Sequence, residues 1–244
     1  MATTAKTKSL SQSKIVIIGG SSGIGFATAK ATATLGAGVI IASATQKKID
    51  AALQHLPQNA TGQVLDVTNE AQVKDFFAGI GAFDHLVYTA GENIKLGLLA
   101  DSDAAESKEY FNIRYWGAMM CAKYATPYVL GSITFTSGVA ANRPGPGWWL
   151  GSSICSAMEG FTRALSIELA PLRVNIVSPG VVKTPLWDSM SEADREGLYS
   201  SYADKLPVNY VADADDLAKT YIYLMQQQYA TGQAVVVDGG AVLV

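Results

Sequence analysis

The sequence has few of the residues from which metal sites and disulfide frameworks are built. Among 244 residues there are two cysteines, Cys121 and Cys155, and two histidines, and no metal-ligand spacing joins them. Two cysteines in a chain of this length do not make a disulfide framework, and no apolar signal sequence precedes them. We therefore expect no metal site and a cytoplasmic location.

Basic residues and long apolar runs are also scarce. The formal net charge is -3, which gives no sign of the basic surface that binding to nucleic acid requires. No apolar run reaches the roughly 18 residues needed to cross a bilayer. The sequence therefore predicts a soluble protein that binds neither nucleic acid nor membrane.

Apolar residues are plentiful, at 49% of the chain against 16% charged residues. This composition and length suit one α/β domain with an ample core. Residues 1–13 are polar and carry Lys6 and Lys8. We expect them to form a flexible N-terminal arm, with a targeting arm as the alternative, ahead of one domain over residues 14–244.

Short β-branched runs alternate with longer Ala-rich segments along that domain. Strands are predicted at 14–19, 38–43, 62–67, 83–90, 132–137, 173–178 and 234–239. Helices are predicted at 25–36, 47–56, 70–79, 104–129, 147–165 and 213–227. Strands separated by helices in this way predict a doubly wound, Rossmann-type α/β fold with a seven-stranded parallel sheet and helices on both faces.

One stretch, residues 180–212, departs from this short-looped pattern. Irregular segments of this length in compact domains are either functional lids or disordered. It follows the carboxyl end of a strand, which is where open α/β sheets bind ligands. We therefore predict a substrate lid over residues 180–212.

A glycine-rich turn, IIGGSSGIG, joins the first predicted strand to the first predicted helix and contains Gly19, Gly23 and Gly25. Glycine permits a tight turn and close backbone approach, while the free N–H groups of the helix start hold a pyrophosphate. A turn without a ligand is the alternative. The strand before the turn and the helix after it favour binding of a dinucleotide. Ser21, Ser22 and Ile24 lie in the same loop and are expected to bind it as well.

Nearly the whole chain resembles the short-chain dehydrogenase/reductase family. Five short sets of residues follow the family's motifs in order: Ile18, Gly19, Gly23, Ile24 and Gly25; Asp66 and Val67; Ala90 and Gly91; Pro179, Gly180 and Thr184, with Val182 between them; and the closing TGQAVVVDGG. Two of them depart from the family pattern, because Ile18 replaces a threonine and only Ala90 and Gly91 remain of Asn-Asn-Ala-Gly. The resemblance implies that these residues bind a nicotinamide nucleotide, with Asp66 at the adenine. It also implies a homodimer or homotetramer and a small-molecule substrate.

The end of the second predicted strand bears on the choice of cofactor. An acidic residue there binds the ribose 2′-hydroxyl of NAD and repels a 2′-phosphate. This chain has no acid at that place and offers Ser43 and Thr45, followed by Lys47 and Lys48. NADP(H) is favoured over NAD(H), although the lysines also suit a solvated helix start.

The segment 147–165 resembles the family's active-site helix without its catalytic side chains. Alignment on Glu159 to Arg163 places Gly151 where the family has tyrosine and Cys155 where it has lysine. The family's serine falls on Gly138, beside Ser137, which substitutes only if the strand end is irregular. Asn112 matches the family's catalytic asparagine, so the chain is predicted to lack the Ser-Tyr-Lys set.

This substitution limits the chemistry. Reduction of a ketone creates an alkoxide, and a positioned acid typically contributes about 10²–10⁴-fold to such a step. An iminium-like carbon accepts hydride without needing a proton. The sequence thus favours atypical hydride transfer to a small, largely apolar molecule in specialised metabolism, with a non-redox cyclase or isomerase and a nucleotide-binding pseudoenzyme as alternatives.

Other residues are candidates for the missing roles. Glu92 follows a strand's carboxyl end, and Arg114, which points away from the Asn112 face on a regular helix, is catalytic or a surface charge. Tyr88, at the first asparagine of the family's Asn-Asn-Ala-Gly, is expected to pack. The substrate pocket is expected to contain five residues: Gly138, Trp148, Trp149, Gly151 and Cys155. Cys155 is interpreted as packing rather than as a nucleophile.

Overall fold

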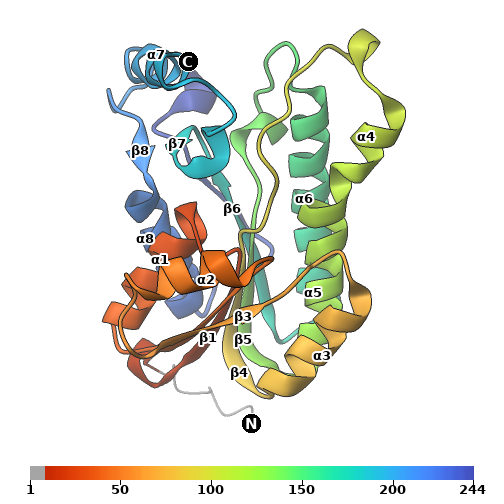
Figure 1. Ribbon diagram of the computed structural model, residues 1–244, viewed down its shortest axis with the longest axis vertical. Coiled ribbons are helices and arrows are strands. Elements are labelled where there is room, and N and C mark those ends of the chain that lie inside the picture. The colour runs from red at the N-terminus through yellow and green to blue at the C-terminus, as the bar shows by residue number, and fades with distance from the viewer. Residues whose placement is uncertain (1–8) are drawn as a thin grey trace.

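Seven parallel strands form the central sheet of the computed structural model, which describes residues 9–244 (Figure 1). Their order across the sheet is β3-β2-β1-β4-β5-β6-β9. The strands are β1 (Lys14–Ile18), β2 (Gly38–Ser43), β3 (Ala60–Val64), β4 (Phe83–Tyr88), β5 (Val129–Thr136), β6 (Arg173–Pro179) and β9 (Ala234–Val237). The predicted fold class, a single doubly wound α/β domain with seven parallel strands, is confirmed.

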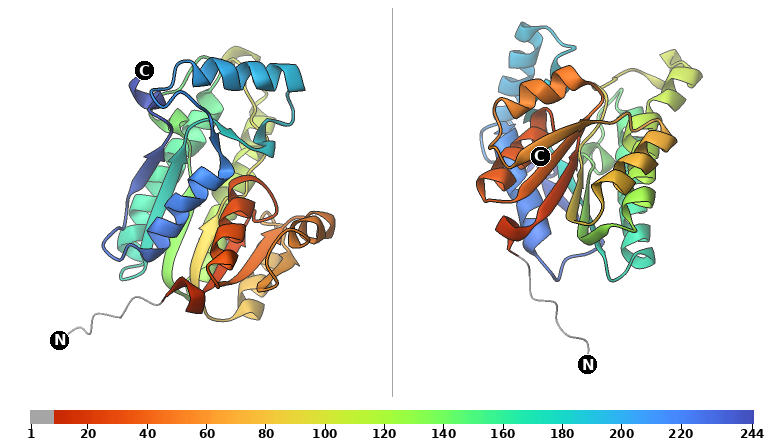
Figure 2. Two further views of the ribbon diagram at one scale, coloured as in Figure 1. Left: turned by 90° about the vertical axis from the view of Figure 1, so that its left-hand side faces the viewer. Right: turned by 60° about the horizontal axis from the view of Figure 1, so that its bottom comes forward.

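Helices cover both faces of this sheet. On one face lie α3 (Glu70–Ile80), α5 (Ala118–Ala125) and α6 (Trp149–Glu168), whose apolar residues join one core cluster. On the other lie α1 (Gly23–Thr34) and α8 (Ala214–Gln226), which pack side by side, with α2 (Gln46–Leu53) toward the β3 edge (Figure 2). Both faces of the central strands are therefore buried, and every residue of β4 is buried.

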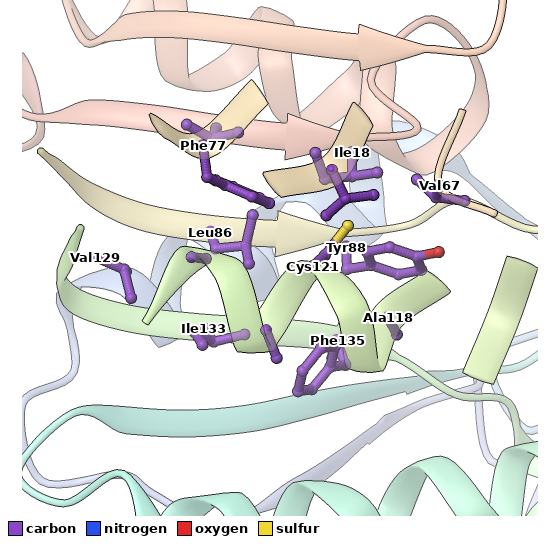
Figure 3. Packing of buried hydrophobic residues seen from close by; sticks show 14 of the residues in the cluster. Ile18, Val67, Phe77, Leu86, Tyr88, Ala118, Cys121, Val129, Ile133 and Phe135 are labelled. Atoms are coloured by element: carbon purple, nitrogen blue, oxygen red, sulfur yellow. The ribbon is translucent and has the colours of Figure 1, made fainter. Parts of the chain in front are cut away.

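The larger core cluster fills the space between β4, β5 and the helices α3 and α5. Phe77, Leu86 and Ile133 are fully buried there, beside the thiol of Cys121 and the ring of Tyr88 (Figure 3). This packing explains why the β-branched and aromatic runs of the sequence form strands that are apolar on both sides.

Two predicted elements differ in the structure. The helix predicted at 104–129 is divided into α4 (Ala104–Glu109), a π-helical segment (Asn112–Gly117) and α5. A π-helix takes up an extra residue per turn, so side chains before and after it no longer follow one regular helical face.

The stretch predicted to be irregular, 180–212, is folded. It contains the short strands β7 (Val182–Lys183) and β8 (Ala212–Asp213), a 3₁₀ turn (Pro185–Trp187) and α7 (Glu192–Ala203). Four of its buried apolar residues form a cluster separate from the two that flank the sheet: Trp187, Tyr199, Leu206 and Val211. Val182, at its start, instead belongs to the cluster on the α1 and α8 face. We call residues 180–212 the cap; α7 and α4 project beyond the sheet on opposite sides (Figure 1).

The predicted N-terminal arm falls partly outside the described residues, which begin at Ser9 and so exclude Lys6 and Lys8. Within the described part, Leu10–Gln12 form a 3₁₀ turn, and the Leu10 side chain is buried in the core beside α1. Residues 10–12 are therefore part of the domain rather than of an arm. Across residues 9–244, no helix combines the length and hydropathy that a membrane crossing demands.

The separate core of the cap predicts that it can loosen while the sheet stays folded. Truncation of a buried tryptophan costs about 3–5 kcal/mol, and Trp187 also donates a hydrogen bond from Nε1 to the Val182 carbonyl, 3.0 Å away. We expect Trp187→Ala to speed proteolytic cleavage within 180–212, as mapped by mass spectrometry of the fragments. Tyr210→Ala, which removes an exposed aromatic side chain of the cap, is the control. Unchanged cleavage in Trp187→Ala would contradict a separate cap core.

Candidate active site

A large cleft lies at the carboxyl ends of the central strands, between the α1 loop and the cap. Its cavity volume is about 1170 Å³, above the range of roughly 300–1,000 Å³ usual for one small ligand. The strand order reverses between β1 and β4, which is the place where doubly wound sheets bind dinucleotides. The cleft therefore has room for a dinucleotide and a second molecule.

The glycine-rich loop forms one end of this cleft. Gly19 and Gly23 have φ angles of +84° and +53°, which a side chain would strain. No side chain caps the start of α1, since Ser22 makes no such hydrogen bond and the first turn holds no acid. Uncapped N–H groups at a helix start suit a phosphate. All the loop residues named from the sequence line the cleft: Gly19, Ser21, Ser22, Gly23, Ile24 and Gly25.

Beyond this loop, only some residues at the end of β2 and the start of α2 line the cleft. The Ser21 hydroxyl donates to the Ser43 hydroxyl at 2.8 Å, and Ser43 and Lys48 both line the cleft. Thr45, predicted to contact the ribose, instead caps α2 by accepting a hydrogen bond from the Lys48 N–H at 3.4 Å, and it does not line the cleft. Lys47 is likewise outside it, so Lys48 is the lysine of this pair that reaches the site.

Asp66 and Val67 follow β3, which ends at Val64, earlier than predicted. Both line the cleft. The Asp66 carboxylate accepts hydrogen bonds from the N–H and the hydroxyl of Thr68, at 2.9 and 2.7 Å. These bonds fix one carboxylate oxygen, Oδ1, in a turn.

The far side of the cleft is bordered by β6 and the start of the cap. The residues there that the sequence pointed to all line it: Pro179, Gly180, Val182 and Thr184, together with Ala90 and Gly91 from the end of β4. An added Cβ at Gly180 would lie 2.9 Å from the Asp238 backbone. The backbone therefore approaches β9 closely at this point.

Small side chains occupy two of the positions of α6 that face the cleft. Gly151 and Cys155, one turn apart, both line it. A Cβ at Gly151 would have Trp148 as its nearest neighbour, at 3.8 Å, so the space beside it is open. Neither residue supplies a proton donor comparable to a phenol or an ammonium group.

Ser137 lies just after β5, where the strand has ended, and its hydroxyl turns toward α6. It donates to the Cys155 carbonyl at 3.2 Å and lies 3.3 Å from the Glu159 carboxylate. Ser137 and Gly138 both line the cleft. The Ser137 N–H still donates to the Val177 carbonyl at 2.7 Å, so the strand pairing is regular up to this residue and the irregular strand end that a role for Ser137 requires is not seen.

The Cys155 thiol has no local base to activate it. Burial raises its pKa above the ordinary value, and the charge of Arg114 and the hydrogen bond with Ser137 lower it by less. A thiol of this kind stays protonated near neutral pH and is a poor nucleophile.

The π-helical segment places a charged side chain at the inner end of the cleft. Arg114 lines the cleft and is about one-quarter exposed. Its guanidinium packs on Gly91 so closely that a Cβ there would lie 2.6 Å from Cζ. Arg114 donates to the Glu92 carbonyl and forms an ion pair with the Glu92 carboxylate, with 3.3 Å between Nε and Oε2.

This geometry corrects three expectations. Asn112 is exposed and does not line the cleft, so its predicted place at the reacting centre is wrong. Arg114 faces the cleft because the segment is π-helical rather than regular. Glu92 lies behind Arg114 outside the cleft, and burial raises its pKa while Arg114 lowers it.

The two tryptophans at the start of α6 differ in their positions relative to the cleft. Trp148 lines the cleft and packs against the apolar cluster of the cap. Trp149 donates from Nε1 to the Ser102 hydroxyl at 3.2 Å and lies outside the cleft, contrary to its predicted place in the pocket.

Several lining residues escaped the sequence analysis. They come from the cap, α6 and the loop before it, and include Arg143, Ile154, Met158, Trp187, Lys205 and Leu206. No motif marks them, because they meet only after the cap folds over the sheet. No group of three metal-ligating side chains occurs among the described residues.

The arrangement combines an uncapped helix start, a long cleft and one partly buried ion pair at its inner end. An arginine stays charged at all physiological pH values and donates hydrogen bonds to oxygen atoms, but it does not give up a proton. The site can therefore hold an anionic nucleotide and stabilise negative charge on a second molecule without a proton donor on α6.

Comparisons with known proteins agree with this geometry. The family model for enoyl-(acyl carrier protein) reductase matches residues 19–242. The short-chain dehydrogenase/reductase malC of Malbranchea aurantiaca is 34% identical over 263 aligned positions, which cover 100% of both chains.

Two solved structures are also similar. MalC reductase/Diels-Alderase from the same organism has a TM-score of 0.88 and 31% identity, over 98% of this chain and 100% of that one. A small-chain dehydrogenase in complex with NADPH has a TM-score of 0.81 and 34% identity, over 96% and 100% of the two chains.

The raised pKa of Cys155 predicts a thiol that stays unreactive at neutral pH. In the folded protein at pH 7 we expect alkylation by iodoacetamide to be far slower than that of free cysteine, and to accelerate as the pH rises and the thiolate forms. Cys121, more deeply buried, is the internal control, and both should react at once in denaturant. Rapid labelling of native Cys155 at pH 7 would show an activated nucleophile.

Proposed function

The chain belongs to the short-chain dehydrogenase/reductase family of NAD(P)-dependent oxidoreductases, and from this premise we propose that it binds NADP(H) and transfers hydride to or from a small, largely apolar molecule without a catalytic tyrosine and lysine. The observation that carries this proposal is the combination, in one cleft, of a complete nucleotide loop with Gly151 and Cys155 on α6. The cofactor, when bound, supplies or accepts the hydride.

The lining residues support a fit for the nucleotide. The free N–H groups at the start of α1 suit the pyrophosphate, and Asp66 lies where the family resemblance places the adenine. Lys48 and the paired hydroxyls of Ser21 and Ser43 line the cleft, and their charge and hydrogen-bond donors support recognition of a ribose 2′-phosphate. The absence of an acid at this place favours NADP(H) over NAD(H).

The proposed reaction follows from the charge at the inner end. Arg114 cannot act as a general acid, so reduction of an ordinary ketone lacks its proton donor. Hydride transfer to an iminium-like carbon needs none. Because Glu92 is ion-paired with Arg114, the guanidinium repels a cationic substrate less than an unpaired one would.

The substrate side of the cleft is largely apolar. Trp148, Ile154, Met158, Trp187 and Leu206 line it from α6 and the cap. The open space beside Gly151 leaves room for a bulky substrate where a tyrosine would otherwise stand. A molecule of specialised metabolism with an extended hydrocarbon or aromatic body fits this description.

A cyclase is the second candidate. It is favoured by the similarity to a protein described as both a reductase and a Diels-Alderase. A cleft that holds an apolar substrate in one reactive geometry accelerates such a reaction without a proton donor. A pseudoenzyme is the least favoured alternative, because scaffolding alone does not require this nucleotide loop.

We also propose a homo-oligomer in the cytoplasm. The family resemblance implies a homodimer or homotetramer, and the half-exposed Trp116 on the π-helical segment is the kind of residue that an interface covers.

The cofactor proposal predicts an effect confined to one lysine. Lys48→Ala should raise the Kd for NADPH roughly tenfold, the value of one charged contact, and leave the weaker binding of NADH unchanged. Quenching of tryptophan fluorescence during titration measures both affinities. Lys47→Ala, next to it but outside the cleft, is the matched control. If neither nucleotide binds the wild-type protein, the proposed function is wrong.

The reaction is tested with extract of a host from which the gene has been deleted. Wild-type protein should convert an accumulated molecule only when NADPH is added and should not turn over simple ketones. Arg114→Ala should not slow this conversion, because hydride transfer to an iminium-like carbon develops no negative charge for the guanidinium to stabilise, and Arg163→Ala, an exposed arginine on α6, is the control. A loss of roughly 10²-fold in Arg114→Ala alone would instead show that an anionic oxygen forms in the reaction. Conversion without NADPH consumption would replace hydride transfer with the cyclase.

A further inference from the structure

We propose that the buried hydroxyl of Tyr88 is a positioning group that, together with Glu92, holds the π-helical segment so that Arg114 faces the cleft. This inference rests on the proposed function only in that Arg114 lies beside the substrate in the cleft. Tyr88 touches neither the cleft nor the guanidinium, so it acts through the backbone of the residue before Arg114.

That residue, Ile113, is held at both of its backbone polar groups, by one side chain from the end of β4 and one from the loop that follows it. Its N–H donates to Glu92 Oε1 at 3.2 Å, and its carbonyl accepts a hydrogen bond from the Tyr88 hydroxyl. Two bonds on opposite sides of one residue fix both the position and the rotation of the chain there. Arg114 is the next residue, so the same two hydrogen bonds fix the position of its Cα.

Tyr88 is suited to donate this bond. It is the last residue of β4, and its side chain is 2% exposed. Burial raises the pKa of the phenol well above its ordinary value, so the hydroxyl keeps its proton and is a donor. Figure 3 shows the Tyr88 ring within the core cluster, with its oxygen at the end away from Leu86.

The Tyr88 hydroxyl is closely surrounded by Gly117 and Val67. A Cβ on Gly117, the last residue of the π-helical segment, would lie 2.6 Å from the Tyr88 oxygen and 2.8 Å from Val67 Cγ2. Glycine at 117 therefore admits the tyrosine. The family resemblance places asparagine at position 88. Its side chain is too short to carry a donor from β4 to the Ile113 carbonyl.

Glu92 completes the arrangement from the other side. One carboxylate oxygen holds the Ile113 N–H, and the other pairs with Arg114 Nε at 3.3 Å. The same side chain thus fixes the backbone and orients the guanidinium. Tyr88 supplies the bond that Glu92 cannot make, because a carboxylate accepts hydrogen bonds and does not donate to a carbonyl.

The test is Tyr88→Phe, which removes the hydroxyl and keeps the ring. We expect phenylglyoxal to modify Arg114 severalfold to roughly tenfold faster than in wild type, the factor that corresponds to one buried hydrogen bond. Peptide mass spectrometry assigns the modified arginine. Hydrogen exchange of the amides of residues 112–118 should quicken by a similar factor, while exchange in β4 and β5 stays as in wild type.

Tyr221→Phe is the matched control. Tyr221 is also fully buried, and its hydroxyl is 2.7 Å from that of Thr136 rather than near residues 112–117. It should lose a similar amount of thermal stability and leave the reactivity of Arg114 unchanged. If Tyr88→Phe leaves both Arg114 modification and local exchange as in wild type, or if Tyr221→Phe changes them equally, the positioning role is wrong.

These measurements do not depend on the reaction. Failure of the wild-type protein to bind NADPH would overturn the proposed function and leave the reactivity of Arg114 informative. Normal NADPH binding by Tyr88→Phe, with Arg114 released, is the combination expected when both proposals hold.

Discussion

The close contact between the first turn of α1 and the end of β4 is the constraint on which the site depends. A Cβ at Gly25 would lie 2.3 Å from Thr89 Oγ1, and one at Gly19 would lie 2.6 Å from the Ala90 nitrogen. The N–H and hydroxyl of Thr89 both donate to the Ile18 carbonyl, at 2.9 and 3.0 Å. These contacts hold β1 and β4 together where the strand order reverses, and the cleft opens from that point.

From this point the two ends of the cleft are built differently. The nucleotide end is built around the backbone groups, glycines and serine hydroxyls of one contiguous loop, joined by Ser43, Lys48 and Asp66 from the segments after β2 and β3. The inner end uses side chains from α6, the π-helical segment and the cap, which are brought together only by the tertiary fold. Substitutions on α6 can therefore remove proton donors without disturbing the glycine-rich loop.

The same division explains how much could be predicted from the sequence. The order and type of the strands followed from β-branched runs between Ala-rich segments, because the hydrophobic pattern of a parallel sheet is local. The residues of the glycine-rich loop follow one another in the chain, and all of them line the cleft. The strand ends do not follow from this pattern as closely: β3 begins two residues earlier than the run 62–67 indicates.

What the sequence did not reveal depends on contacts between distant residues. The run YFNIRYWGAMMCA gives no sign of a π-helix, because its extra residue is held by Tyr88 and Glu92, more than twenty positions away. Asn112 and Arg114 were therefore assigned to the wrong faces. The sequence does not distinguish the capping role of Thr45 from ribose binding, because both use the same hydroxyl chemistry. The cap looked irregular because α7 is polar and its few apolar residues are buried only against one another and neighbouring loops.

The separate core of the cap has a consequence for how this enzyme scaffold changes over generations. Since Trp187 and Tyr199 pack in a cluster with cap residues, Trp148 and neighbouring loops rather than with the strands, a mutation beside them that alters the cleft does not have to be compensated in the sheet. Selection can act on the shape of the substrate side while the nucleotide side is inherited intact. A lineage can then acquire new substrates through the cap, at little risk to folding.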